Sequence, residues 1–587
     1  MTHQTESTVA DLVGQLSAGA ISLEEFLWGA AGAGLDRREA ARYAVAAAAT
    51  ATPGNRSAEA GTGEARASGA SGPAAASDAS GASGEARASG AAGASPAGGV
   101  LRVGLWLAVD GMDPAISTYR TSRLLTEQLY STLMALGPDG RPYPDLAEWI
   151  EVSEDALTYT FGIVAGVLFH DGTPVTADDV AFSLNRLLEM GEAYHFDPWV
   201  ATIAGADVVD TLTVRLRLTQ PTGPILTWLA FCGTGVVPRA AVEADRDLNR
   251  EPIGSGPFRL ARPWGGTDSG ESILLERHDA SVRGGHPFTP RLPGLEFTAI
   301  LSAADRVAAL REGRIDLDAL LGADDFAAVA GTTGLVAHET PDSRWHWLVV
   351  NCRQAPLGDV RVRRAIALAI DRRELLDAGF LGHGTPIGAG VIAPWSWAAA
   401  RDLDGFGPTA DPAAARALLA DAGVAEGTKL VITAMDSLGI AIRQAELIAD
   451  QLRAVGLGAE VAVVDGAAWG ASVTRDGDFQ LATSYWGSPI WDPDDFVYMG
   501  FRSGARYDLG SCSTRALDET MDRGRGTVVQ AERRAAYGDL QALALEQLPV
   551  IPTIQPAMLR GTTARLRGYI PTPCAQLRTL RDAWLEE

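Results

Sequence analysis

One stretch of low complexity divides the chain into two unequal parts. Residues 53–99 are dominated by Ala, Gly, Ser, Glu and Arg, and the octapeptide GEARASGA occurs twice, at 63–70 and at 84–91. Such a composition buries too little apolar surface to offset the conformational entropy that folding removes. We therefore expect a disordered, flexible linker that tethers a terminal segment, residues 1–52, to a body that begins at Val100.

The terminal segment has the apolar spacing of helices, and two interpretations of it stay open. Its two apolar stretches lie at 23–35 and 37–51, and neither reaches the roughly 18 apolar residues of a membrane span. The layout resembles a degenerate twin-arginine export signal in which Leu-Glu has replaced the arginine pair, or in which the pair has moved to Arg37-Arg38. The segment is either an export signal or a helix pair retained in the cytoplasm.

The composition of the chain excludes several classes of function. The 49 basic and 73 acidic residues give a net charge of −24, and no stripe of Lys and Arg alternates with aromatic residues, so we expect no nucleic-acid partner. The single lysine, Lys429, follows Thr428, which excludes a phosphate-binding loop of the Walker type. The four cysteines form no C-x-x-C pair and the eight histidines no H-E-x-x-H motif, so we expect no metal site of the protein's own and no cofactor. Whether a metal accompanies the ligand and whether the cysteines form disulfides stay open.

Strand and helix patterns mix throughout the body. LRVGLWL at 101–107 predicts a buried strand, and TLTVRLRLT at 211–219 predicts a half-buried one. Residues 177–190, 359–380 and 441–456 have apolar residues at helical spacing. At 587 residues the chain is too long for one core, so these patterns indicate an α/β protein with more than one lobe.

Residues 146–186 carry the most specific pattern. TYTF predicts a strand, a second strand ends at Phe169, and Asp171-Gly172 predicts a turn. A helix should follow with Thr176 as its N-cap and two aspartates in its first turn, where they favour the helix dipole. The segment therefore predicts a strand–strand–turn–helix unit.

This unit closely resembles the family 5 solute-binding proteins of ABC importers, the peptide, nickel and opine type. Members carry a phrase that this chain repeats from Leu146-Ala147-Glu148 through Phe169-His170-Asp171-Gly172-Thr173-Pro174 to Phe182-Ser183. The resemblance covers residues 100–587, and its other matches are Met112-Asp113-Pro114, Gly254 to Phe258, Arg306 to Asp316, Asn351, Val362 to Ala365, Ala369 to Arg372, Asp411-Pro412, Leu418-Leu419, Ala422-Gly423 and Leu548 to Pro552.

The resemblance implies an α/β, two-lobed periplasmic-binding-protein fold of the class C type, with a hinge and an extra subdomain in the first lobe. The implied first lobe spans 100–350, with the subdomain at about 135–250; the second lobe spans 351–547, and 548–587 return to the first. A ligand that contacts both lobes would stabilise the closed form.

The implied function is the capture of a small organic ligand, peptide-like or opine-like, by a monomer that delivers it to an ABC permease in the membrane. This function places the protein in the periplasm or at the cell surface. The alternative is a cytoplasmic member that acts as an enzyme or a sequestering protein. The body supplies no recognisable pair of nucleophile and base, so we expect no enzymatic activity.

Candidate ligand-binding residues come from the aromatic loops of the second lobe. An aromatic-lined cleft suits ligand binding away from solvent, although any single tryptophan fits the core equally well. The tryptophans concerned are Trp345, Trp347, Trp395, Trp397, Trp486 and Trp491. The predicted binding residues are Trp347, Asn351, Trp395, Tyr485, Trp486, Ser488, Trp491 and Asp492.

The stretch TSYWGSPIWDPDDF at 483–496 bears directly on the ligand. Peptide-binding relatives have Trp-x-x-Asp-Tyr-x-Asp-Pro here, and the first Asp holds the ammonium group of the peptide through a charge-assisted bond. When Trp486 is aligned with the family tryptophan, Pro489 stands at the anchoring position. We therefore hypothesise that the ligand is not an ordinary oligopeptide held by its free amine, unless Asp492, Asp494 or Asp495 substitutes from a shifted loop.

Overall fold

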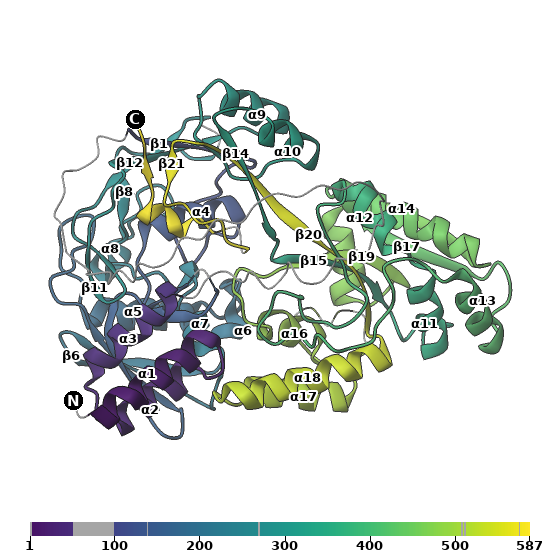
Figure 1. Cartoon of the computed structure of the whole chain (residues 1–587), viewed down its shortest axis with the longest axis horizontal. Coiled ribbons are helices and arrows are strands. Elements are labelled where there is room, and N and C mark those ends of the chain that lie inside the picture. Colours follow the sequence, from purple (N-terminus) through teal and green to yellow (C-terminus); the bar gives the residue numbers. More distant parts are fainter. Residues whose placement is uncertain are drawn as a thin grey trace, which may run out of the picture.

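One long strand, β20 (Val550–Thr563), runs through both lobes of the protein (Figure 1). In the computed structural model, which describes residues 3–50, 99–137, 139–267, 270–505, 507, 509, 512–573 and 576–587, every residue of β20 except Ala557 is buried. Its first half pairs with β15 (Arg344–Val350) and β16 (Gly384–Pro386), and its second half pairs with β13 (Leu317–Asp318) and β14 (Leu335–Pro341). The two lobes therefore share one sheet, and the chain passes between them at residues 341–344.

The first lobe is built around β1 (Leu101–Leu105), whose apolar side chains are all buried. β1 lies parallel to β12 (Gly294–Ala299) on one side and to β13 on the other. β9 (Ile273–Arg277) and β8 (Phe258–Leu260) extend the sheet in antiparallel fashion. The lobe's helices are α4 (Arg120–Leu129), α7 (Ile225–Trp228), α8 (Arg239–Glu243), α9 (Ala303–Arg311) and α10 (Ala323–Ala330).

A separate four-stranded antiparallel sheet lies within the range expected for the extra subdomain. Its order is β4 (Ala147–Val152), β5 (Thr158–Ile163), β7 (Thr213–Leu218) and β6 (Ile203–Asp210). The predicted helix is confirmed as α5 (Ala177–Met190), and Thr176 and Asp179 form the capping box at its start. Short elements complete this lobe: α6 (Asp197–Val200), β2 (Met134–Leu136), β3 (Pro142–Pro144), β10 (Ser281–Arg283), β11 (His286–Phe288), β21 (Leu566–Arg567) and β22 (Trp584–Leu585).

The second lobe has β19 (Leu481–Gly487), β17 (Lys429–Met435) and β18 (Gly458–Val464) beside β15. Its helices are α11 (Val360–Ala369), α12 (Arg372–Phe380), α13 (Pro412–Asp421), α14 (Gly439–Ala454), α15 (Gly466–Trp469), α16 (Asp494–Phe501), α17 (Arg515–Arg525) and α18 (Gln530–Gln547). Cys352, just after β15, forms a disulfide with Cys512, just before α17. The sequence alone had left the disulfide state open.

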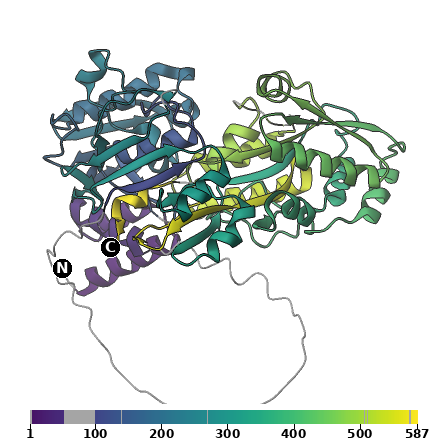
Figure 2. The same cartoon turned by 90° about the horizontal axis from the view of Figure 1, so that it is seen from above.

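The N-terminal segment forms three helices, α1 (His3–Ala18), α2 (Leu23–Gly32) and α3 (Arg37–Thr50), which we call the N-terminal unit. Figure 1 shows it in purple against the first lobe, at the opposite end of that lobe from the C-terminus and beside α17 and α18, and Figure 2 shows it against the first lobe from above. Phe26 and Ala30 are fully buried there. No helix in the described part of the chain is long and apolar enough to cross a membrane. The linker predicted at 53–99 lies outside the described residues, apart from Gly99.

Candidate ligand cleft

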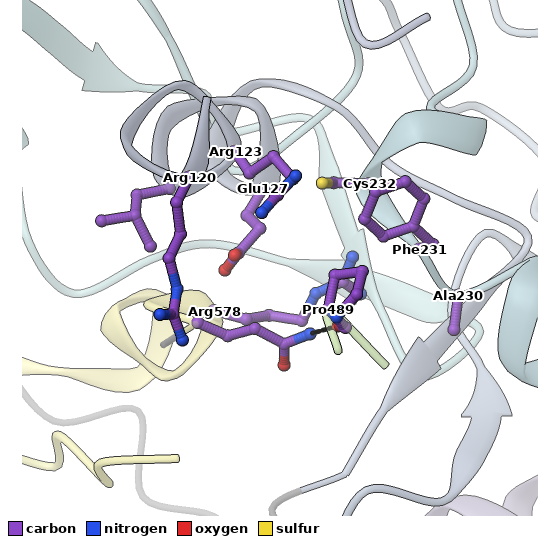
Figure 3. A pocket seen from close by; sticks show the side chains of 10 residues that line it. Arg120, Arg123, Glu127, Ala230, Phe231, Cys232, Pro489 and Arg578 are labelled. Carbon is purple, nitrogen blue, oxygen red and sulfur yellow. Dashed lines mark hydrogen bonds between the residues drawn. The ribbon is translucent and has the colours of Figure 1, made fainter. Parts of the chain in front are cut away.

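A small cavity lies at the seam between the lobes, which we call the cleft cavity (Figure 3). The second lobe contributes Pro489, and the first lobe contributes the other lining residues: Arg120, Arg123, Leu124, Glu127, Ala230, Phe231, Cys232, Gln576 and Arg578. Its volume is about 20 Å³, which is room for about one water molecule. Hydrogen bonds cross the seam from Gln576 to Pro489 at 3.3 Å and from Trp199 to Met499 at 3.1 Å, so the lobes are closed on each other here and a larger ligand needs them to separate.

Helix α4 supplies the charged wall of the cleft cavity. Arg120, Arg123 and Glu127 follow one another at spacings of three and four residues, which puts them on one face of a helix. Figure 3 shows these side chains extending from α4 toward Arg578 and Pro489 on the opposite side. The rest of this amphipathic helix packs inward, since Leu125 and Leu129 are fully buried.

Burial shifts the arginines of this wall toward their neutral forms. It lowers the pKa of Arg120 to about 10, although Asp342 accepts a hydrogen bond from its Nη2 at 3.2 Å. It also lowers the pKa of Arg123, whose Nη1 donates to the carbonyl oxygen of Thr118 at 3.0 Å. Arginine keeps its proton in proteins, so both side chains are cationic, and an anionic partner stabilises a cation that has lost solvent in this way.

Glu127 and Cys232 complete the polar surface of the cavity. Burial raises the pKa of Glu127 to about 7, and its Oε2 accepts a hydrogen bond from the backbone N–H of Leu577 at 3.0 Å. Burial also raises the pKa of Cys232 to about 11, so this side chain is a neutral thiol at physiological pH.

Arg578 forms a 3.5 Å ion pair with Asp145. Asp342 and Asp145 offset part of the charge of Arg120 and Arg578, but each of these acids is shared with a second arginine, Arg344 and Arg581 respectively. Positive charge therefore exceeds negative charge around the cavity.

The acids on the second-lobe side are already engaged by other side chains. Arg533 donates two hydrogen bonds to Asp492, at 2.7 and 2.8 Å, and Arg525 holds Asp494 at 2.7 Å. Asp495 accepts a hydrogen bond from Trp486 Nε1 at 2.9 Å, and burial raises its pKa to about 7. In the closed form, none of these three carboxyl groups has the free, ionised character that a peptide ammonium group requires.

Pro489 stands at the position where the family pattern has its anchoring aspartate, and it lines the cleft cavity. Its carbonyl oxygen accepts a hydrogen bond from Gln576 Nε2 at 3.3 Å, which joins the two lobes across the seam. Next to it, Ser488 Oγ accepts from the backbone N–H of Ile490 at 3.3 Å and shapes the turn. Ser488 is therefore a residue of the loop's own structure in the closed form.

The remaining predicted binding residues lie at varying distances from the cleft cavity. Trp491 and Asp492 line a second cavity, described below, and Trp395 packs edge-on against Trp491 at 5.2 Å between ring centroids. Trp395 also donates to the carbonyl oxygen of Asp342 at 3.0 Å. These three residues gather beside the Pro489 loop and near the hinge.

The others are embedded in the second lobe. Trp486 and Tyr485 belong to β19, where Trp486 packs against Phe496 and Arg344 lies over the ring of Tyr485. Trp347 is 2% exposed within the aromatic core. Asn351 is fully buried, and its Nδ2 donates to the carbonyl oxygens of Gly477 and Phe479 at 2.9 and 2.8 Å.

None of the eight predicted residues lines the cleft cavity, whereas the residues that carry its charge were not predicted. The available signal was in RTSRLLTEQL at 120–129, where arginines and a glutamate recur on the face of a helix whose other side chains are apolar or neutral. Among the described residues, no group of three or more His, Cys, Asp or Glu side chains could hold a metal ion.

Comparisons with known proteins agree with this architecture. The sequence matches the bacterial extracellular solute-binding proteins, family 5 (middle), over residues 141–508, more than half of the chain. The chain belongs to this family of solute-binding proteins. The predicted family and the predicted two-lobed α/β fold are thereby confirmed.

Individual relatives are distant but cover most of the chain. The glutathione-binding protein GsiB of Salmonella paratyphi A is 25% identical over 467 residues, covering 78% of this chain and 89% of its own. The dipeptide-binding protein of Escherichia coli is 27% identical over 462 residues, covering 73% and 84%. The solved structure of the PBP AgaA from A. tumefacien R10 in complex with agropinic acid has a TM-score of 0.70 and 26% identity, covering 83% and 99%.

Proposed function

We propose that this solute-binding protein captures a small organic anion, peptide-like or opine-like, between its lobes and presents it to an ABC permease. The observation that carries the proposal is the cleft cavity, where Arg120, Arg123 and Arg578 face the seam and Pro489 faces them without a charge. An anionic group, above all a carboxylate, fits guanidinium groups in a closed, low-dielectric site.

Closure of the lobes supplies the selectivity in this proposal. A ligand that binds both walls stabilises the closed form only by the difference between its affinities for the closed and open forms. The relatives named above bind glutathione, a dipeptide and agropinic acid, and this range supports a ligand of comparable size. The protein would act as a monomer without a nucleic-acid partner.

Binding without catalysis is the form of the proposal that the site supports. The one thiol on the cavity wall, Cys232, has a pKa of about 11 and is a poor nucleophile at neutral pH. The family is one of extracellular proteins, which supports a periplasmic or cell-surface location. The cytoplasmic alternative has no support in the comparisons.

Calorimetric titration with matched ligands tests the proposal. We would titrate glutathione and short peptides in three forms each: unmodified, N-acetylated and C-terminally amidated. We expect acetylation of the amine to leave the affinity nearly unchanged and amidation of the carboxylate to weaken it about 10- to 100-fold. Equal affinity for the acid and amide forms, or strict dependence on the free amine, would contradict an anionic grip.

Native mass spectrometry of the protein purified from its own host complements the titration. We expect a co-purifying molecule that carries at least one carboxylate or other anionic group. The Arg123→Gln variant should lose this molecule, and a variant at an exposed arginine, Arg515→Gln, should retain it. A trapped cationic molecule would overturn the proposed ligand class.

A further inference from the structure

The N-terminal unit contacts both lobes, and nothing in the solute-binding function accounts for it. Toward the first lobe its contacts are extensive and apolar. Phe26, Ala30 and Ala44 share one buried core with Val152 and Tyr159 of the subdomain sheet. Trp28 Nε1 donates to the carbonyl oxygen of Val152 at 3.1 Å, and ion pairs join Arg37 to Glu151 at 2.6 Å and Arg38 to Glu148 at 2.9 Å.

Toward the second lobe, the hydrogen bonds of the unit converge on the start of α18. The backbone N–H of Gln530, the first residue of α18, donates to Glu25 Oε2 at 2.9 Å. Four residues along, Arg534 Nη2 donates to the carbonyl oxygen of Gly19, in the turn between α1 and α2, at 3.1 Å. The unit is therefore fixed firmly to one lobe and lightly to the other.

Glu25 caps the N-terminus of α18 from outside that helix. The N-cap residue of α18, Val529, has no side chain that can accept a hydrogen bond from the first turn. The Glu25 carboxylate supplies the acceptor and places a negative charge at the positive end of an 18-residue helix. The same Oε2 also accepts from Ser22 N at 2.8 Å, so the capping box of α2 holds the carboxylate in place.

A second cavity, the seam cavity, lies where the unit and both lobes meet. Its volume is about 50 Å³, and its lining includes Glu24 from the unit, Arg141 from the first lobe, and Trp491, Asp492 and Arg533 from the second. Glu24 is 3% exposed, and burial raises its pKa to about 7, an effect that the charge of Arg533 partly offsets. Arg533 is paired with Asp492, which follows Pro489 by three residues in the same loop. The unit therefore borders the loop that contributes Pro489 to the lining of the cleft cavity.

We propose that the N-terminal unit is an interlobe latch, in which Glu25 on α2 and the Gly19 carbonyl group hold α18 and keep the lobes closed over the cleft cavity. Glu25 directly follows the Leu23-Glu24 that stands where an export signal would carry its arginine pair. The acidic side chain at position 25 has a physical role in this structure, since an arginine there would oppose the helix dipole of α18. Opening the lobes breaks the contacts to α18, because those to the first lobe are far stronger.

The latch can be released from the α18 side with little damage to either lobe. Proline is well tolerated at the first position of a helix and has no N–H, so Gln530→Pro removes only the donor to Glu25. The preceding residue, Val529, already has the extended conformation that a following proline requires. Gln530→Ala keeps the N–H and is the matched control. Combining each with Arg534→Ala or leaving Arg534 intact gives four full-length variants.

Opening can be read at Cys232, which is 7% exposed in the cleft cavity opposite Pro489. We would follow its alkylation by N-ethylmaleimide with peptide mass mapping, which separates Cys232 from Cys574. We expect about tenfold faster labelling in Gln530→Pro/Arg534→Ala than in the wild-type protein, and an unchanged rate in Gln530→Ala. Small-angle scattering should give a larger radius of gyration for the double variant only.

The outcomes separate the latch from a merely structural role. Faster labelling with an expanded but cooperatively folded protein supports the latch. Unchanged labelling and an unchanged radius of gyration in Gln530→Pro/Arg534→Ala overturn it. If the double variant unfolds, the single Gln530→Pro variant decides by the same two measurements. No ligand is used, so the result is independent of whether the proposed ligand class is right.

Discussion

The two walls of the cleft treat buried charge in opposite ways. On the first-lobe wall, burial lowers the pKa of Arg120 and Arg123, which favours their neutral forms. On the second-lobe side, burial acts in the same direction on Arg533 and Arg525, but the charges of Asp492 and Asp494, their hydrogen bonds and nearby tyrosines together outweigh it and raise both pKa values. Arg533 and Arg525 therefore each hold a carboxylate within the second lobe, whereas Arg123 on the first lobe donates to the carbonyl oxygen of Thr118 and faces the cavity.

This difference assigns separate tasks to the two walls. A bidentate pair such as Arg533–Asp492 is saturated, so it stiffens the loop that presents Pro489 and has little left to offer a ligand. The guanidinium of Arg123 donates to a neutral carbonyl, so an incoming anion improves its surroundings. We infer that the first lobe discriminates the ligand's charge while the second lobe supplies a rigid, uncharged lid. The following predictions test this division.

The largest effect is expected on the second-lobe side. Arg533→Ala leaves the carboxylate of Asp492 buried and without its partner, which should lower the free energy of unfolding by about 3 to 5 kcal/mol. Arg523→Ala breaks an exposed pair with Asp539 on the neighbouring helix, and its effect should stay below about 1 kcal/mol. Urea unfolding of both variants measures the difference. Equal losses would mean that the Arg533–Asp492 pair is no stronger than a surface pair.

The next prediction concerns pH and the first-lobe wall. The pKa of Glu127 rises from about 4.5 in the unfolded chain to about 7 in the folded protein, so the folded state binds the extra proton between these values. The free energy of unfolding contributed by this group therefore falls as the pH rises from about 4.5 to 7, and stays low above that range.

Glu127→Gln removes this pH-dependent term while an amide oxygen can still accept from Leu577. The free energy of unfolding of the variant minus that of the wild-type protein should be larger at pH 8 than at pH 5 by about 2 to 3 kcal/mol. Chemical unfolding at the two pH values, with the exposed Glu519→Gln as control, provides the measurement. A parallel pair of curves for Glu127→Gln and the wild-type protein would show that Glu127 titrates normally.

The fold was far more predictable from the sequence than the site. Strands and capped helices depend on the local spacing of apolar and capping residues, so Thr176 predicted the start of α5 and TYTF predicted β5. The eight predicted binding residues were chosen by residue type and loop position, and Trp347 and Asn351 proved to be buried within the second lobe. Whether a buried side chain meets a cavity or the core depends on tertiary packing, which no local spacing contains.

Long-range partners explain the other gaps. Asp492 looked available as an anchor, but its partner Arg533 lies 41 residues away on α18. Glu25 lies in the stretch that resembles a degenerate export signal, and its contact with Gln530 spans 505 residues. Such pairings become visible only when the fold brings the segments together, because a charged residue at one position constrains nothing in the local sequence of its partner.

The first-lobe wall should show the reverse of the Arg533 result. Arg123→Gln removes a buried cation that has no bidentate carboxylate partner, so the free energy of unfolding should change by less than about 1 kcal/mol. Affinity for an anionic ligand should nevertheless fall about 10- to 100-fold, because a charge-assisted contact is lost. Calorimetry and urea unfolding on one preparation check both halves. A variant that loses stability but keeps its affinity would reverse the roles assigned to the two walls.

The smallest expected effect comes from giving the second-lobe wall a charge. Pro489→Asp puts a carboxylate at the position where peptide-binding relatives hold the ammonium group, and Pro489→Asn is its neutral control of the same shape. Arg120, Arg123 and Arg578 across the cavity will attract the new carboxylate and compete with the ligand for it. We therefore expect the affinity for peptides with a free amine to rise only a few-fold. The same carboxylate should weaken binding of N-acetylated, purely anionic ligands by a similar factor, because it adds a negative charge inside the electropositive cavity.

Calorimetry with each peptide and its acetylated form measures both changes. If Pro489→Asp and Pro489→Asn bind the two forms equally, the identity of residue 489 does not set the ligand's charge, and the uncharged lid would then have to be sought elsewhere on the second lobe.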